Sequence, residues 1–299
     1  MKILNFGSCN IDIVYSLDHI VRVGETETTH KMEVFPGGKG LNQSIAVSRA
    51  GASVCHAGCL GYDGGMLRDI LCESGVDVTY LKTVEEKNGH AVIQVSAEGE
   101  NSIFLYPGSN ERITESYIDE VLAQFGEGDI LLLQNEISNV GYLVERAYEK
   151  KMCIVLNPSP INDAVRGLDL AKISYLILNE VEAAEITGHE TPEEGIAYFK
   201  SRYPALRVML TLGENGCIYA DSERELSQSA FLVKAVDTTA AGDTFTGYFV
   251  AGLAAGNEMK EILRVASAAT AISVTRNGAA PSIPERREVM SRLDELCSH

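Results

Sequence analysis

Apolar runs that alternate with helical segments constrain the fold of this 299-residue chain more than any other feature. Six runs have the continuous apolar character of buried strands, at residues 2–8, 53–61, 129–134, 152–160, 173–180 and 207–213. Segments with helical character follow them at residues 41–51, 64–75, 140–150 and 193–203. This alternation is typical of a parallel sheet covered on both faces. We therefore predict an α/β fold with a central, mainly parallel sheet, and ligands beyond the carboxyl ends of its strands.

Two stretches interrupt this alternation. Residues 12–35 are polar and β-branched without helical periodicity, and residues 90–107 read as two alternating strands around the turn "EGEN". A small separate sheet made from both stretches would form a lid over the strand ends, or an oligomer interface that covers its exposed edges. We expect one domain over residues 1–299, with lid segments at about 12–35 and 90–107.

Charge and cysteine content limit the partners and the compartment. Asp and Glu number 42 against 25 Lys and Arg, a net charge of −17, which argues against nucleic acid or an anionic membrane as partner. An anionic substrate would need a local positive site. The cysteines, seven in number and ending with Cys297, favour reduced thiols, and "CHAGC" at 55–59 lacks the C-x-x-C spacing of zinc sites. With no targeting peptide and no long apolar span, we predict a cytoplasmic protein.

The sequence has two glycine-rich loops: one precedes a predicted helix, and the other follows a predicted strand. "PGGKGLNQ" at 36–43 would let backbone approach a ligand closely, while Lys39 and Asn42 supply hydrogen bonds. A flexible loop with a solvated lysine is the alternative, and the spacing is not that of a P-loop. "TLGENG" at 211–216 favours a plain turn when its residues are considered alone.

The stretch "DTTAAGDTF" at 237–245 places Asp243 at the start of an apolar helix. The N–H groups of Ala240, Ala241, Gly242 and Asp243 would point out of the helix N-terminus, which carries about half a positive charge. An anion hole beside a carboxylate suits phosphoryl transfer to an alcohol, since donors stabilise the phosphoryl oxygens and a base takes the alcohol proton. The alternative is an ordinary acidic residue in a first helical turn, which is mildly stabilising.

Together, "PGGKGLNQ" and "DTTAAGDTFTG" resemble the two signatures of the ribokinase-like (PfkB) carbohydrate kinases. Further segments have counterparts in that family, in the same order: "GSCNIDIV", "GETE", "EGEN", "LLLQNE", "LNPSP", "LNEVEAAEITG", "TLGENG" and "VTRNGAAPSIP". The resemblance covers nearly the whole chain, and the two signatures at this separation are far more specific than either alone. It implies a ribokinase-like α/β sandwich with a small β-sheet lid, and a homodimer formed through that lid.

The resemblance also implies roles for particular residues. Asp243 matches the base that deprotonates the primary hydroxyl of the sugar, and Ala240, Ala241 and Gly242 match the anion hole. The positions that match sugar-binding residues are Asn10, Asp12, Gly38, Lys39, Asn42 and Glu136. A carboxylate such as Asp12 can accept hydrogen bonds from two vicinal hydroxyls. A solvated carboxylate at a strand end is the alternative for Asp12.

The remaining matched positions concern the nucleotide and ions. Asn179 and Glu182 match an N-x-x-E motif that orders Mg²⁺, water and phosphate, and ordinary helix capping is the alternative. The matched nucleotide-binding positions are Thr211, Leu212, Gly213, Glu214, Asn215, Gly216 and Gly242. The positions that match a site for K⁺ or another monovalent cation are Asp237, Thr239, Ser273, Arg276, Gly278 and Ser282.

The implied activity is ATP-dependent phosphorylation of a sugar, with D-ribose giving ribose 5-phosphate as the first expectation. Another small sugar, a sugar acid or a nucleoside is the alternative acceptor, because Pro36, Tyr106 and Pro107 depart from the family's smaller residues near the sugar pocket. A non-catalytic sugar or nucleotide sensor is a different class, but it would not need Asp243 as a base. A Rossmann oxidoreductase lacks its G-x-G-x-x-G after the first strand.

Overall fold

The computed structural model describes residues 1–296. The strands are β1 (Ile3–Phe6), β2 (Asn10–Ser16), β3 (Lys31–Gly37), β4 (Val54–Leu60), β5 (Asp77–Thr83), β6 (His90–Val95), β7 (Asn101–Tyr106), β8 (Ile130–Gln134), β9 (Cys153–Asn157), β10 (Tyr175–Asn179), β11 (Arg207–Thr211), β12 (Cys217–Ala220) and β13 (Glu225–Gln228). The α-helices are α1 (Lys39–Arg49), α2 (Gly65–Glu73), α3 (Glu115–Leu122), α4 (Val140–Glu149), α5 (Asp163–Arg166), α6 (Glu180–Thr187), α7 (Pro192–Arg202), α8 (Ala241–Ala254), α9 (Met259–Ser273) and α10 (Arg286–Leu296). Short 3₁₀ helices are η1 (Gly108–Arg112), η2 (Leu170–Lys172), η3 (Gly213–Asn215) and η4 (Ala280–Ser282).

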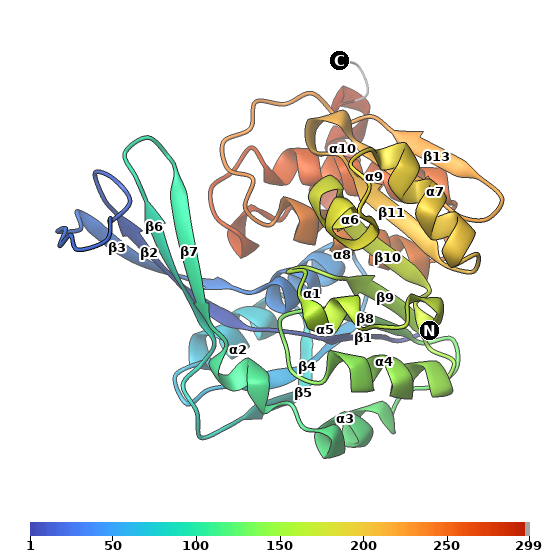
Figure 1. Cartoon of the computed structure of the whole chain (residues 1–299), viewed down its shortest axis with the longest axis horizontal. Helices are drawn as coiled ribbons and strands as arrows, with labels where there is room; N and C mark the ends of the chain where they lie inside the picture. Colours follow the sequence, from blue (N-terminus) through green and yellow to red (C-terminus); the bar gives the residue numbers. More distant parts are fainter. Residues whose placement is uncertain (297–299) are drawn as a thin grey trace.

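A nine-stranded sheet forms the body, in the order β13-β12-β11-β10-β9-β8-β1-β4-β5 (Figure 1). The strands from β5 across to β11 pair in parallel, and β12 and β13 add an antiparallel edge. All six predicted strands are present, and they form the centre of this sheet. The prediction of a mainly parallel α/β sheet is confirmed.

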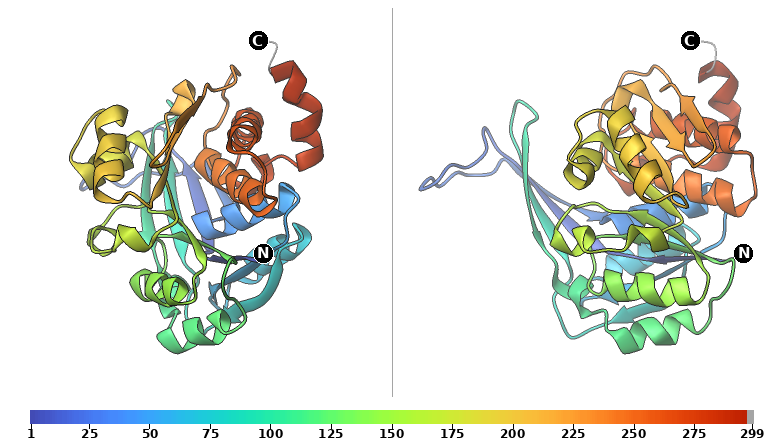
Figure 2. Two further views of the ribbon diagram at one scale, coloured as in Figure 1. Left: turned by 90° about the vertical axis from the view of Figure 1, so that its right-hand side faces the viewer. Right: turned by 45° about the vertical axis from the view of Figure 1, so that its right-hand side comes forward.

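Helices cover both faces of the sheet (Figure 2). Alternate residues of one strand enter different cores: Ile130 and Leu132 of β8 pack with α1, α8 and α9, whereas Leu131 and Leu133 pack with α3, α4 and α7. A strand buried on both faces has no polar position to alternate with, which explains the continuous apolar runs in the sequence. Both cores end at the carboxyl edge of the sheet, where polar side chains begin.

A second sheet of four strands, in the order β3-β2-β6-β7, extends away from the body (Figures 1 and 2). The inner strands β2 and β6 pair in parallel. On the outside, β3 pairs antiparallel with β2, and β7 pairs antiparallel with β6. The predicted small β-sheet is thus confirmed. It includes a few residues more than the expected segments, because β2 begins at Asn10 and β3 runs to Gly37. We call this four-stranded sheet the lid sheet.

The structure also bears on the membrane and cysteine expectations. Within residues 1–296, no helix has both the length and the apolar character that crossing a bilayer requires. The described thiols are free, and burial raises the pKa of Cys59 and Cys217 to about 11. Cys297 lies outside the described residues.

Candidate active site

Polar residues gather where the parallel strands end. Gln134 of β8 pairs in register with Asn157 of β9, and Asn179 of β10 pairs with Thr211 of β11. These four residues are the last of their strands, so they lie along one edge of the sheet. The order of the strands therefore separates the two groups of expected ligands. The sugar-binding positions lie towards β1 and β8, and the nucleotide positions lie at β10 and β11.

The "GGKG" loop brings helix α1 against the start of the chain. Gly38 has a φ of +92°, and a Cβ added there would lie 2.9 Å from the backbone nitrogen of Asn10. A Cβ at Gly40 would lie 2.3 Å from the nitrogen of Ser8, so only glycine allows this approach. The backbone N–H of Lys39 donates to Oε2 of Glu136 at 3.0 Å. The loop thus joins the expected sugar-binding residues from three elements.

Asp243 lies in the first turn of α8 and is only 7% exposed. Its Oδ2 accepts a hydrogen bond from Nδ2 of Asn42 at 3.1 Å, and its Oδ1 accepts one from Nε2 of Gln43 at 2.9 Å. Both partners come from α1, about 200 residues earlier in the chain. The two signature segments therefore meet, and two side chains of the first contact the carboxylate of the second.

The N-terminus of α8 has the free donors that an anion hole requires. Ala240 is left-handed, with a φ of +59°, and within residues 1–296 the N–H groups of Ala240, Gly242 and Asp243 have no hydrogen-bond acceptor. The N–H of Ala241 donates to the carbonyl oxygen of Thr238 at 3.1 Å, so three of the four expected donors are free. Gly242 is exposed, and a Cβ there would meet nothing within 4 Å. An anion can approach this helix end directly.

Three acidic residues and one lysine set the charge of the site. Burial, together with the carboxylates of Glu136 and Asp243, raises the pKa of Asp12 to about 7. Burial also raises the pKa of Glu136, although Lys39 and a hydrogen bond from Ser8 oppose it. For Lys39, burial favours the neutral amine, but the charges of Asp243, Glu136 and Glu182 outweigh it and raise the pKa. Lys39 therefore stays positive in an otherwise acidic site.

One buried polar atom of the expected sugar-binding residues has no protein partner among residues 1–296. Oδ1 of Asn42 is buried and has no hydrogen-bond partner, as expected of a group that waits for a ligand hydroxyl. Asn10 is held by Nδ2 of Asn110, which donates to its Oδ1 at 2.7 Å. A cavity of about 540 Å³ adjoins Asn10 and Glu136, and Tyr106 and Pro107 line it. Tyr106 and Pro107, which depart from the family's smaller residues, therefore lie beside the expected sugar site.

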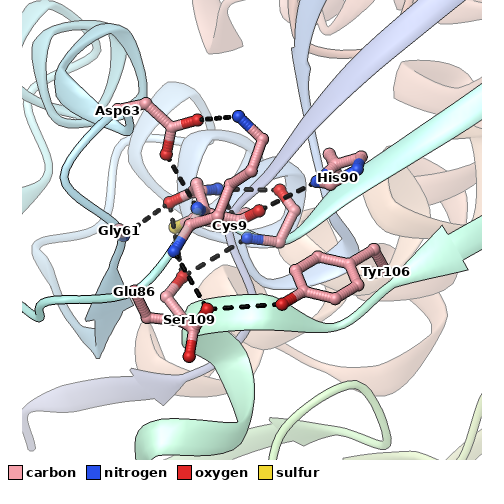
Figure 3. Close-up of polar contacts among 10 residues, drawn as sticks. Cys9, Gly61, Asp63, Glu86, His90, Tyr106 and Ser109 are labelled. Carbon is pink, nitrogen blue, oxygen red and sulfur yellow. Dashed lines mark hydrogen bonds and ion pairs between the residues drawn. The ribbon is translucent and has the colours of Figure 1, made fainter.

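The base of the lid sheet is fixed to the body by buried polar contacts (Figure 3). Asn88 donates from Nδ2 to the carbonyl oxygen of Cys9 at 2.9 Å and accepts from the N–H of Gly61, also at 2.9 Å. At the other side, the hydroxyl of Tyr106 donates to Glu86 at 3.3 Å, and its ring lies 5.0 Å from that of His90. These contacts position the ends of β2, β6 and β7 next to the cavity.

On the nucleotide side, the structure contains the capping interaction that the sequence left as an alternative. Oδ1 of Asn179 accepts from the N–H of Glu182 at 2.9 Å, and Oε2 of Glu182 accepts from the N–H of Asn179 at 3.0 Å. Oε1 of Glu182 keeps no partner within residues 1–296, so one carboxylate oxygen is available for an ion. The loop 211–216 closes through a hydrogen bond from the N–H of Leu212 to the oxygen of Gly216 at 2.8 Å.

Part of the expected cation site comes together. Oδ1 of Asp237 accepts from Thr239 and its Oδ2 accepts from the N–H of Gly278 at 2.8 Å. Partial burial opposes it, but these hydrogen bonds hold the pKa of Asp237 below its ordinary value, which keeps an anionic oxygen donor there. The N–H of Arg276 donates to the carbonyl of Ser273, and both the N–H and the hydroxyl of Ser282 donate to the carbonyl of Ala279. The hydrogen bonds therefore join Asp237, Thr239 and Gly278, whereas the side chain of Arg276 is directed to Glu288 of α10, and Ser273 and Ser282 bond to residues three positions earlier.

Sequence reasoning did not identify the buried amides behind Asp243. Gln43 forms hydrogen bonds with both Gln134 and Asn157, and it donates to Asp243. The signals were visible: Gln43 follows Asn42 in the glycine-rich segment, and the other two end apolar strands. Which of them would meet depended on the order of strands in the sheet, and that order is a tertiary property.

Comparison with known proteins identifies the class of the chain. The family model described as pfkB family carbohydrate kinase matches residues 1–286. The chain belongs to this family, and it is an ATP-dependent phosphotransferase. The predicted family and enzyme class are confirmed.

Individual relatives have the name ribokinase. The ribokinase of Haemophilus influenzae is 37% identical over 297 residues, which cover 96% of this chain and 97% of the relative. The structure of a Cryptococcus neoformans ribokinase in complex with ADP has a TM-score of 0.86 and 34% identity, and covers 97% of this chain and 99% of its own. The Arabidopsis thaliana ribokinase complexed with ribose and ATP has a TM-score of 0.86 and 28% identity, with 98% of both chains covered.

Proposed function

We propose that this kinase transfers the γ-phosphoryl group of ATP to the primary hydroxyl of D-ribose and forms ribose 5-phosphate and ADP. The observation that carries the proposal is the pairing of Asp243 with free N–H groups at the start of α8, next to the sugar-binding positions of α1. The similarity to ribokinases over nearly the full length supports ribose as the acceptor. We propose that residues 1–299 act as one unit, with the lid sheet closing over the acceptor and excluding water.

The proposed acceptor site lies between the lid sheet and α1. Asp12 of β2 accepts hydrogen bonds from the sugar hydroxyls, and Nδ2 of Asn10 donates one to them. Oδ1 of Asn42 accepts another. Gly38 provides close backbone approach, and Lys39 and Glu136 bound the other side of the site. These contacts orient the primary hydroxyl towards Oδ2 of Asp243, which takes its proton as the oxygen attacks the γ-phosphorus. The free N–H groups of Ala240 and Gly242 stabilise the charge on the phosphoryl oxygens.

The proposed nucleotide site lies at the ends of β10 and β11. ATP occupies the loop from Thr211 to Gly216 and the surface beside Gly242. Asn179 and Glu182 would hold Mg²⁺, which would neutralise phosphate charge, and the unpaired Oε1 of Glu182 fits this ion's preference for oxygen ligands. Potassium would bind near Asp237, Thr239 and Gly278, whose carboxylate and carbonyl oxygens suit a hard cation. Carbonyl oxygens near Ser273, Arg276 and Ser282 complete that proposed site.

An acceptor panel tests the proposal. ADP release with MgATP would be measured for D-ribose, 2-deoxyribose, a ketohexose, a sugar acid and a nucleoside, with and without K⁺. The proposal predicts the highest kcat/KM for ribose and an increase with K⁺. A higher kcat/KM for another acceptor would support the kinase reaction but contradict ribose as its substrate. Tyr106 and Pro107 would then be the first residues to substitute. Sugar binding without turnover on any acceptor would favour the sensor.

Binding of ribose is expected to weaken as the pH falls through about 7. Asp12 is mostly protonated below its raised pKa of about 7, and a protonated carboxyl loses one of its acceptor oxygens. Since only the ionised fraction binds well, we expect the Kd for ribose to rise roughly tenfold from pH 8 to pH 6. Titration calorimetry at constant ionic strength would measure it. An Asp12→Asn variant should bind weakly with a flatter profile, and an unchanged Kd in the unmodified protein would contradict the role of Asp12.

We further propose a homodimer formed through the lid sheet. β7 is exposed along its length, and apolar side chains on β3 and β7 face solvent, including Val34 (43%), Ile103 (53%) and Leu105 (53%). Such an edge and apolar face would be covered by a second copy. Sedimentation velocity should show a particle of about twice 32.4 kDa.

Introducing charge on that apolar face tests the dimer. Ile103 and Leu105 point to the same side of β7, and replacing both by glutamate should give monomers. Leu232→Glu, at an exposed apolar residue outside the lid sheet, is the matched control and should stay dimeric. A dimer that survives the double substitution would show that the interface lies elsewhere.

A further inference from the structure

A set of buried hydrogen bonds continues from Asp243 into the protein, on the side away from the acceptor. The side chains of Gln43, Gln134, Asn5 and Ser44 in this set are fully buried. Nε2 of Gln43 donates to Oδ1 of Asp243 at 2.9 Å, and Nε2 of Gln134 donates to Oε1 of Gln43 at 2.6 Å. None of these four residues is among the expected ligands. They nevertheless connect the base to the strand ends of the central sheet.

The hydrogen bonds fix the amide of Gln43 in one orientation. Its Nε2 has two acceptors, Oδ1 of Asp243 and Oδ1 of Asn157 at 3.1 Å. Asn157 is fixed in turn, since its Nδ2 donates to the carbonyl of Ile177 at 3.0 Å. Turning the Gln43 amide over would place its oxygen against the Asp243 carboxylate and its nitrogen against the nitrogen of Gln134. That orientation loses every bond, so the donor of Gln43 always faces Asp243.

The side chain behind Gln43 is fixed as well. Nε2 of Gln134 is shared between Oε1 of Gln43 and Oδ1 of Asn5, at 2.6 and 3.1 Å. Nδ2 of Asn5 donates to the carbonyl of Gly40 at 2.7 Å and to Oγ of Ser44 at 2.8 Å. These contacts join β1, β8 and α1 through side-chain hydrogen bonds and one bond to the backbone carbonyl of Gly40. Oε1 of Gln134 has no hydrogen-bond partner among residues 1–296, so the orientation of this amide depends on the two acceptors of its Nε2, Gln43 and Asn5.

The two oxygens of Asp243 have different surroundings. Oδ1 faces Gln43 and the buried amides. Oδ2 faces Asn42, whose own Oδ1 is unpaired and available to the acceptor. Both oxygens therefore accept a hydrogen bond from α1, but only Oδ2 is bonded by an expected sugar-binding residue.

We propose that Gln43 is a positioning residue for the base: it anchors Oδ1 of Asp243, favours the ionised carboxylate and leaves Oδ2 to take the hydroxyl proton. Gln134 acts one step behind by fixing the Gln43 amide. The inference rests on the proposed role of Asp243 as base. Gln43 itself touches neither acceptor nor nucleotide in this arrangement, in contrast to the ligand position Asn42.

The decisive measurement is the titration of the Asp243 carboxyl carbon by ¹³C NMR in the whole protein, with Asp243→Asn to assign the signal. The charged groups that act on Asp243 are Lys39, Glu136 and Asp12, and every variant retains them. Gln43→Leu removes the donor at similar volume. Because a hydrogen bond to the charged form favours ionisation, its loss should raise the titration midpoint by about one pH unit. Gln43→Glu places a second carboxylate there and should raise the midpoint further.

Turnover gives a second readout. For Gln43→Leu we expect kcat to fall roughly tenfold or more, the KM for MgATP to stay within about twofold, and the acid limb of kcat to move to higher pH. Gln134→Met removes no direct contact of Asp243. It should lower kcat less than Gln43→Leu does and move the acid limb of kcat in the same direction by a smaller amount. Tyr248→Phe is the matched control, because it removes one buried hydrogen bond from α8, to the carbonyl of Pro284. It should lower stability without moving the pH profile.

The outcomes separate this inference from the proposed function. An unchanged titration midpoint in both Gln43→Leu and Gln43→Glu would overturn the role of Gln43, whatever the activity. An unfolded Gln43→Leu leaves Gln43→Glu and Gln134→Met to decide in the same way. A shifted midpoint in a protein without acceptor-dependent ADP release would support the contact and contradict the kinase reaction proposed for Asp243. If the Gln43 variants lose stability but keep the wild-type pH profile of kcat, as expected for Tyr248→Phe, Gln43 has only a structural role.

Discussion

Asp243→Asn is expected to lower kcat about 1,000-fold or more while the Kd for ribose changes little. The substitution removes the carboxylate proposed to take the hydroxyl proton and retains the size of the side chain, which is almost completely buried and bonded to Asn42 and Gln43. The free N–H groups of α8 remain, so residual phosphoryl transfer above the uncatalysed rate should persist. Steady-state kinetics and titration calorimetry on the same preparation would separate the two effects.

The control for this substitution is Asp119→Asn. Asp119 is a surface carboxylate on α3 that bonds to Arg146 and Tyr142, far from the sheet edge where the site lies. It should retain wild-type kcat with at most a small loss of stability, as exposed ion pairs contribute little. Asp243→Asn with kcat within a few-fold of wild type would remove Asp243 as the base.

Asp12→Asn should have the second largest effect, on binding. Hydrogen bonds to a charged group contribute about 1.5–3 kcal/mol each, so we expect the Kd for ribose to rise roughly 100-fold. kcat at saturating ribose should fall less, since Asp12 lies on β2 of the lid sheet and not at the start of α8, where we propose that the phosphoryl group binds. Calorimetry with ribose and kinetics over a wide ribose range would measure both quantities.

Asp18→Asn is the matched control in the same part of the chain. Asp18 forms an exposed pair with His30 and is 69% exposed, so its removal should leave ribose binding unchanged. Equal weakening by both substitutions would mean that the charge of the lid sheet, and not the position of Asp12, governs binding. An Asp12→Asn variant with wild-type affinity would place the sugar elsewhere.

The parts of the fold that the sequence predicted are those in which local pattern and tertiary position coincide. β1, β8, β9 and β10 are buried on both faces, so an apolar run identifies each of them. β5 is half exposed and polar, with its only buried residue at Leu81, and its run did not stand out as a strand. Edge strands are specified mainly by what they pair with, and that is not a local property.

Within the site, single residues could be predicted but their connections could not. Asp243 and Asn42 stand in recognisable segments, while the bond between them spans 201 positions and depends on how α1 packs against α8. Ala240 takes a left-handed φ of +59°, which its sequence does not favour, and this turns the Ala241 N–H to Thr238. The buried amides of Gln43 and Gln134 became apparent only once β1, β8 and β9 were neighbours.

The most direct test of the account is the identity of the product made from ribose and MgATP. ³¹P NMR with proton coupling would be recorded during turnover and compared with authentic ribose 5-phosphate and ADP. The account predicts one new phosphate monoester, coupled to the two C5 protons and formed in equal amount with ADP. A phosphate on the anomeric oxygen, or ADP formed at the same rate without ribose, would contradict it.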